Sequence, residues 1–153
     1  MKIRFMLVWV TMTMMLLLFV GTHPVFADEI HWMKYDEGLV RAKSEHKKIF
    51  LNFHAEWCGF CTKMNKETFT NPALIAYMNQ NFIPIKVDSD RESALAQRYR
   101  VQGLPTSWFL TDKGEQIASQ PGFVAADNLL HMMQYISTDS YKSTSYKDFL
   151  KKQ

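Results

Sequence analysis

The two cysteines of this chain, Cys58 and Cys61, are separated by two residues and are the only cysteines in 153 residues. They follow a short apolar run, residues 49–53, which is typical of a buried central strand. The segment that they open has the composition of a helix. Cysteines three positions apart at a helix start face the same side and can close one small disulfide. A scaffold held by several disulfides is therefore excluded.

The start of a helix is a reactive place for a cysteine. Unpaired backbone N–H groups and the helix dipole put partial positive charge there, which stabilises a thiolate. Cys58 is therefore the candidate nucleophile, which attacks a substrate disulfide to form a mixed disulfide. Cys61 is the candidate that resolves this intermediate. The pair itself carries two electrons, so we expect no cofactor.

A metal site is the main alternative for the cysteine pair. Zinc commonly takes four ligands, and the chain has no second cysteine pair to supply them. Covalent attachment of a c-type haem needs His directly after the second cysteine, and Thr62 stands there. We therefore expect redox chemistry and no metal.

Residues 1–27 are expected to be an export signal. Lys2 and Arg4 precede a stretch, residues 5–27, that contains no Asp, Glu, Lys or Arg. Its end, Val-Phe-Ala, fits cleavage before Asp28. An uncleaved membrane anchor is the alternative, because about 20 apolar residues can span a bilayer. Either way we expect the rest of the chain outside the cytoplasm, in the periplasm, where disulfides persist.

The composition argues against two further classes, disordered proteins and nucleic-acid-binding proteins. Hydrophobic residues make up 47% of the chain, which is enough for a core and excludes disorder for most of it. Without Lys2 and Arg4, 16 basic side chains stand against 15 acidic ones. This balance argues against a dedicated nucleic-acid-binding protein, which needs a basic surface to neutralise phosphates.

Residues 28–137 are predicted to form a single α/β domain, a central mixed sheet flanked by helices. Hydrophobic spacing and turn residues predict helices at 36–46, 58–67, 73–79, 90–99 and 125–136, and strands at 49–53, 82–88, 107–110 and 115–119. Pro84 favours an edge strand or an early position in its strand. Ser89 or Asp90 is the expected cap of the fourth helix. Residues 138–153 are expected to be a polar tail with Tyr141, Tyr146, Phe149 and Leu150 as docking points.

The segment Ala-Glu-Trp-Cys-Gly-Phe-Cys at 55–61, followed by Gly-Leu-Pro-Thr at 103–106, resembles the thioredoxin superfamily. The resemblance covers nearly all of residues 30–137. Residues 35–88 are most similar to exported thioredoxin-like proteins and to the C-terminal domain of the membrane electron carrier DsbD. The resemblance implies a thioredoxin fold and a thiol-disulfide oxidoreductase. It also implies a cis peptide bond at Pro105, which lets Leu104 pair with a substrate strand.

The same resemblance implies which residues border the substrate. They are Trp57, Gly59, Phe60, Leu104, Pro105 and Thr106. For Trp57, plain packing against the active-site loop is an equal alternative.

Two departures from the family pattern bear on mechanism. Many members carry a buried carboxylate six residues before the first cysteine, where this chain has Asn52, which cannot act as a general base. Removal of the Cys61 proton then falls to water, Glu56 or His54, although His54 can instead simply fill space beside its strand. Phe60 stands where strong oxidants have a histidine that stabilises the thiolate. This difference favours a reducing or isomerising potential.

We therefore expect an exported enzyme that reduces or shuffles disulfides in other exported proteins. The resemblance implies a DsbD-like membrane protein as its electron donor. Two alternatives stay open: an oxidant that donates its disulfide to exported chains, and a non-catalytic module that binds extended peptides.

Overall fold

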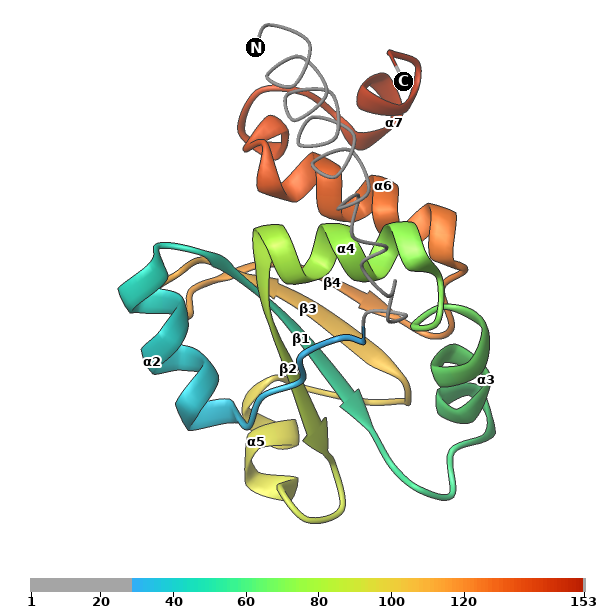
Figure 1. Ribbon diagram of the computed structural model, residues 1–153. Coiled ribbons are helices and arrows are strands. Elements are labelled where there is room, and N and C mark those ends of the chain that lie inside the picture. The colour runs from blue at the N-terminus through green and yellow to red at the C-terminus, as the bar shows by residue number, and fades with distance from the viewer. Residues whose placement is uncertain (1–28, 153) are drawn as a thin grey trace, which may run out of the picture.

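A mixed sheet of four strands forms the centre of the protein in the computed structural model, which describes residues 29–152. The strand order is β2-β1-β3-β4 (Figure 1). The strands are β1 Lys48–His54, β2 Phe82–Asp88, β3 Thr106–Leu110 and β4 Gln116–Pro121. β1 pairs parallel to β2 and antiparallel to β3, and β3 pairs antiparallel to β4. The predicted export signal, residues 1–27, lies outside the described residues.

Helices cover both faces of this sheet. Their bounds are α2 Tyr35–Glu45, α3 Gly59–Glu67, α4 Pro72–Asn81, α5 Ser93–Arg98, α6 Ala126–Ser137, the 3-10 helix η1 Ser140–Lys142 and α7 Tyr146–Leu150. α3, α4 and α6 contribute to the core on one face, and α2 and α5 contribute to the core on the other. Figure 1 shows α4 and α6 side by side over the sheet and α2 at its opposite flank. This is the predicted thioredoxin fold.

Strand β1 is central because both of its faces are apolar. Ile49, Leu51 and Phe53 enter the core beneath α2 and α5, whereas Phe50 enters the core beneath α4 and α6. All four side chains are fully buried. A strand with this pattern is stable only between two neighbouring strands and two helical layers.

Within residues 28–137, the predicted helices and strands match the observed ones within a few residues, whereas η1 and α7 in the expected polar tail were not predicted. Pro84 lies in the edge strand β2, as predicted. The expected cap at Ser89 or Asp90 is wrong, because α5 begins only at Ser93. Instead, the Asp88 carboxylate accepts the N–H groups of Asp90 and Arg91, at 3.0 and 3.4 Å. These bonds hold residues 88–91 in a turn, so the helix begins only after this turn.

The C-terminal residues pack on α6. The Tyr135 ring lies 5.2 Å from that of Tyr146 and 5.3 Å from that of Phe149. Its hydroxyl donates to the Thr144 carbonyl at 2.6 Å. Figure 1 places α7 beyond α6, far from α3. The expected docking by Tyr146 and Phe149 is therefore confirmed.

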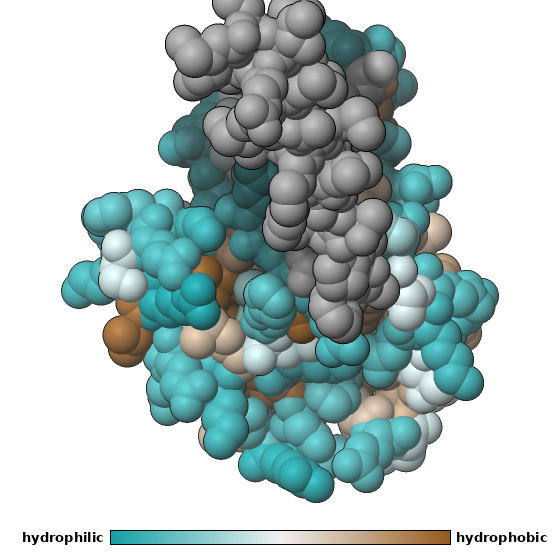
Figure 2. Space-filling model, in the orientation of Figure 1, coloured by the Kyte–Doolittle hydropathy of each residue, from teal (hydrophilic) through white to brown (hydrophobic). Residues whose placement is uncertain are grey.

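Hydrophilic residues dominate the face of the protein shown in Figure 2. Large apolar side chains that are exposed are Val40, Trp57, Phe60 and Leu150. Within residues 29–152, no helix has the length and apolar character that a membrane crossing requires.

Gly38 in α2 allows a test of the packing between α2 and β2. Replacing an internal helical glycine with alanine normally stabilises a helix by about 1 kcal/mol. Here the new Cβ would lie 2.4 Å from both Cγ1 and Cδ1 of Ile85, which is fully buried. We expect the clash to outweigh the helix gain, so that Gly38→Ala lowers the free energy of unfolding by about 1 to 2 kcal/mol in urea titrations.

The Ile85→Ala background tests whether the clash with Ile85 causes the loss of stability. In Ile85→Ala, which removes the clashing atoms, the same Gly38→Ala change should become neutral or stabilising. Stabilisation by Gly38→Ala in the wild-type background would contradict this packing.

Candidate active site

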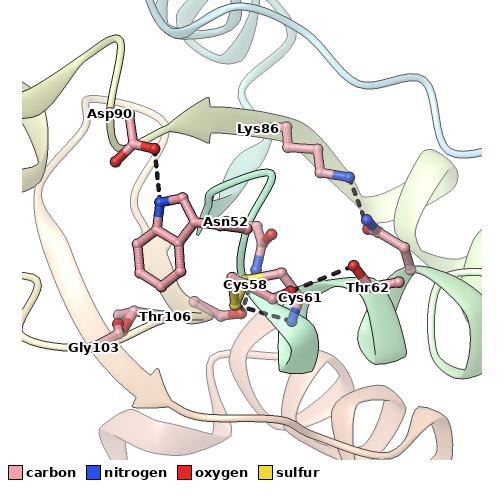
Figure 3. Close-up of a disulfide and its surroundings, with 11 residues drawn as sticks. Asn52, Cys58, Cys61, Thr62, Lys86, Asp90, Gly103 and Thr106 are labelled. Atoms are coloured by element: carbon pink, nitrogen blue, oxygen red, sulfur yellow. Dashed lines mark hydrogen bonds between the residues drawn. A yellow bond between two sulfur atoms is a disulfide. The ribbon is translucent and has the colours of Figure 1, made fainter.

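The cysteine pair lies where β1 runs into α3. β1 ends at His54, a three-residue loop follows, and Cys58 is the residue that caps α3. Cys58 and Cys61 form a disulfide with their Cα atoms 5.2 Å apart (Figure 3). The backbone N–H of Cys61 donates to the Sγ atom of Cys58 at 3.1 Å. An N–H at a helix start directed at this sulfur stabilises a thiolate on Cys58 when the pair is reduced.

The disulfide is recessed between exposed aromatic side chains. Cys58 is 5% exposed and Cys61 is 3% exposed. The adjacent Trp57 and Phe60 are 74% and 64% exposed, although aromatic side chains of this size are commonly buried. Space above Gly59 is open, since a Cβ there would meet no atom within 4 Å. A substrate that reaches Cys58 therefore passes an open apolar rim.

The segment that precedes β3 forms the facing wall. The Leu104–Pro105 peptide bond is cis, as the resemblance implied. Leu104 packs against the small cluster formed by the two cysteines and Ala55. The Thr106 hydroxyl donates to the Gly103 carbonyl at 2.7 Å. Pairing of Leu104 with a substrate strand stays a prediction.

A hydrogen bond fixes the orientation of Trp57. Its indole N–H donates to the Asp90 carboxylate at 2.8 Å (Figure 3). The turn at residues 88–91 makes two further contacts at the active-site loop. The Ser89 N–H donates to the His54 carbonyl at 2.8 Å, and the Arg91 guanidinium lies 3.7 Å from the Glu56 carboxylate. An exposed ion pair such as Arg91–Glu56 adds little stability. Together, these contacts hold the turn and the loop so that the exposed indole lies beside Cys58.

Asn52 lies in the sheet beneath the cysteine helix, at the position where many family members have a carboxylate. Its side chain is 1% exposed, and its amide donates to the hydroxyl of the fully buried Ser107 at 3.1 Å. The two residues are register partners on β1 and β3. The amide is neutral at every pH, so Asn52 supplies no base for Cys61.

The other two candidates for proton removal are placed differently. Glu56 is exposed and pairs with Arg91 on the surface. His54 is half-buried at the end of β1, where burial, followed by the Lys86 cation, lowers its pKa. Within the described residues, no hydrogen bond joins either side chain to Cys58 or Cys61. Which of water, Glu56 and His54 takes the Cys61 proton therefore stays a prediction.

Three residues near the site lie outside the set predicted from the sequence. Asp90, an expected helix cap, instead holds Trp57. Phe123 follows Gly122, whose N–H donates to the Pro105 carbonyl at 2.8 Å, and Lys63 of α3 lies 4.6 Å from its ring centre. Lys86 lies inside β2, and its cation is the second cause, after burial, of the lowered pKa of His54; its signal in the sequence is a charged residue within a buried run.

Among residues 29–152, no three or more His, Cys, Asp or Glu side chains lie together in a group that could hold a metal ion. Both cysteines take part in the disulfide.

Comparison with known proteins assigns the family. The family model described as "Thioredoxin-like domain" matches residues 35–137. This chain belongs to the thioredoxin-like family. The match includes every predicted site residue, from Asn52 to Thr106. The predicted fold and the class of thiol-disulfide oxidoreductase are therefore confirmed.

Curated relatives of this thioredoxin-like protein carry related names. The thiol:disulfide interchange protein DsbD of Vibrio vulnificus is 35% identical over 105 residues, which are 65% of this chain and 18% of DsbD. The disulfide bond reductase DsbH of Chlamydia pneumoniae is 28% identical over 120 residues, 69% of this chain and 72% of DsbH. The chain thus spans less than a fifth of the length of the DsbD relatives that it matches.

Solved structures agree on the fold. A thioredoxin from Thermus thermophilus is 26% identical, with a TM-score of 0.64 over 72% of this chain and 88% of that one. A DsbH oxidoreductase superimposes with a TM-score of 0.61 over 75% of this chain and 91% of that one, at 24% identity.

The environment of His54 predicts a pH effect. Because burial lowers its folded pKa below the ordinary 6.5, the unfolded chain binds more protons between these two values. Stability should therefore fall as the pH drops from 6.5 towards the folded pKa. We expect an NMR titration midpoint for His54 below 6.5, and a smaller loss of unfolding free energy between pH 7 and pH 5.5 in His54→Asn than in the wild type.

The same substitution at the exposed His46 serves as the matched control. A His54 midpoint at or above 6.5 would contradict the described burial.

Proposed function

We propose that this protein is an exported disulfide reductase or isomerase that acts on disulfides of other exported proteins. The observation that carries the proposal is the Cys58–Cys61 disulfide at the start of α3, with the Cys61 N–H on the Cys58 sulfur and exposed aromatic side chains beside it. The uncharged segment at residues 5–27 supports export. The name of the DsbH relative, a disulfide bond reductase, supports the reducing direction.

The reaction begins with the reduced pair. The Cys58 thiolate attacks one sulfur of a substrate disulfide, so that a Cys58–substrate bond forms, the substrate S–S bond breaks, and the released substrate thiolate takes a proton from water. Cys61 then loses its proton to water and attacks the Cys58 sulfur. This step re-forms the Cys58–Cys61 disulfide and releases the second substrate thiol. The substrate gains two electrons and two protons.

The surrounding residues orient the substrate in this proposal. The exposed rings of Trp57 and Phe60 bind the apolar part of an extended peptide near its cystine. The backbone at Leu104 pairs with the peptide as an added strand, and Pro105 and Thr106 shape the wall behind it.

Turnover requires an external dithiol that returns two electrons to the Cys58–Cys61 disulfide. A membrane protein of the DsbD type is the donor that we propose, and the pair needs no further cofactor. Phe60 supports the reducing or isomerising direction, because its ring offers the Cys58 thiolate no hydrogen bond that would make the couple strongly oxidising.

Trapping the mixed disulfide tests whether Cys58 is the nucleophile and Cys61 the resolving cysteine. In Cys61→Ser, Cys58 can still attack but cannot be released by its neighbour. We therefore expect stable mixed disulfides between Cys58 and exported proteins, visible as higher-mass bands on non-reducing gels that disappear with dithiothreitol. Reduction of insulin should fall to background in Cys58→Ser.

Cys58→Ser is the matched control for trapping and should give none of these bands. Equal trapping by both single variants, or insulin reduction retained by Cys58→Ser, would contradict the assignment of Cys58 as the nucleophile.

A further inference from the structure

A hollow outside the candidate active site lies between α3, α4, β2 and the segment that precedes α2. Its volume is about 410 Å³, which falls in the range of sites that hold small molecules. Among the described residues, neither cysteine lines it, and neither do Trp57, Phe60 and Leu104. The hollow is therefore separate from the surface that receives a disulfide in the proposed function.

Apolar side chains form much of the lining of this hollow. Trp32 and Phe69 meet edge to face, with their ring centres 5.0 Å apart. Ile30, Phe69 and Ile75 are 8%, 8% and 6% exposed and belong to the core against which Trp32 packs. Because the core holds these side chains in place, an apolar ligand meets a surface that is already formed.

The Lys86 ammonium group borders the same hollow and has only neutral partners at close range. Its Nζ atom donates to the Asn65 side-chain carbonyl at 2.8 Å, and it lies 5.1 Å from the ring centre of Trp32 and 5.8 Å from that of Phe69. Among residues 29–152, no carboxylate comes within 4.0 Å of it. Figure 3 shows that the Lys86 side chain extends away from the disulfide.

This half-buried cation has lost part of its hydration. Burial lowers the pKa of Lys86, because the carbonyl and the two rings do not fully replace the water that the ammonium group has lost. A carboxylate placed beside Nζ would supply the missing stabilisation, since charge-assisted hydrogen bonds are stronger than neutral ones. The hollow therefore favours an anion at its Lys86 end.

A second donor lies next to the ammonium group. The Asn65 side chain is exposed, and its amide nitrogen makes no hydrogen bond within residues 29–152, so it can donate to a ligand. Glu29 is the one acidic residue among the described residues that line the hollow. Because Glu29 is exposed, water and salt screen its repulsion of an anion more than they screen the attraction of the half-buried Lys86.

We propose that this hollow binds a small organic acid, whose aromatic or branched apolar body packs against Trp32 and Phe69 and whose carboxylate accepts hydrogen bonds from Lys86 and Asn65. Each part of the ligand answers one feature of the site. The apolar lining disfavours a bare inorganic anion, and the ammonium group disfavours a cation. The inference goes beyond the proposed function and does not depend on it.

Binding of phenylacetate to the full chain tests the site. Calorimetry gives the affinity, and NMR shifts of the Trp32 indole N–H and the Thr70 methyl group locate the ligand, because both residues line the hollow. We expect a Kd of about 1 mM or lower. Phenylacetamide keeps the ring and lacks the charge, whereas acetate keeps the charge and lacks the ring. Each should bind at least about tenfold more weakly than phenylacetate.

Two variants test the polar end of the site. Asn65→Asp places a carboxylate beside the Lys86 ammonium group from an exposed position, so the fold should persist while the ligand is repelled. Lys86→Met keeps most of the apolar stem and removes the charge. We expect both variants to bind phenylacetate at least about tenfold more weakly than the wild type, and Lys86→Met to bind phenylacetamide as the wild type does.

Two further variants serve as controls. Lys66→Gln removes an exposed lysine of α3 that does not line the hollow, and its affinity for phenylacetate should stay within about twofold of the wild type. Glu29→Gln removes the opposing charge and should bind phenylacetate as tightly as the wild type or more tightly. The same loss in Lys66→Gln as in Lys86→Met would assign the effect to net charge and overturn the proposal.

The remaining outcomes also decide. Equal affinity for phenylacetate and phenylacetamide, no binding at about 10 mM phenylacetate, or shifts at Trp57 in place of Trp32 would each overturn the proposal. If Lys86→Met does not fold, Asn65→Asp still decides, and wild-type affinity in that variant would contradict the site. If the wild type reduces no protein disulfide, the proposed function fails, yet the affinities still report on the hollow because binding requires no turnover.

Discussion

The burial of β1 on both faces is the constraint on which the rest of this structure depends. Phe50 must lie under α4 and α6, and Leu51 and Phe53 must lie over α2 and α5, so the strand has one position in the sheet. Its end therefore sets where the next helix can begin. Because β1 ends four residues before Cys58, the cysteine pair is held at the helix start, where backbone N–H groups can stabilise a thiolate.

The second determinant of the site is the neutral Asn52 that is buried beneath that helix. A buried carboxylate at position 52 would raise the pKa of a nearby thiol, and the neutral Asn52 does not. Exposed Trp57, held by Asp90, adds an apolar surface next to the reactive sulfur. The N–H group on the Cys58 sulfur and the exposed aromatic surface beside it thus come from different parts of the fold.

Much of this arrangement could be predicted because its signals are local in the sequence. The apolar run before Cys58, the spacing to Cys61 and the period of the later helices fix the order of elements. The cis bond at Pro105 came only from the resemblance, since the residues alone favour trans. The contacts of Asp90 and Lys86 join β2 and its following turn to the active-site loop and to α3. Such contacts join segments 21 or more residues apart, and no spacing rule reports them.

The reduction potential of the Cys58–Cys61 pair decides whether this protein reduces or oxidises disulfides. The full-length protein would be equilibrated in graded thiol-disulfide buffers, its thiols trapped, and the modified cysteines counted by mass. We expect a reversible two-electron couple between about −270 and −180 mV, the range from thioredoxin to protein disulfide isomerase. A value near about −120 mV would make the protein a strong oxidant, and the absence of a reversible disulfide at any potential would contradict redox catalysis altogether.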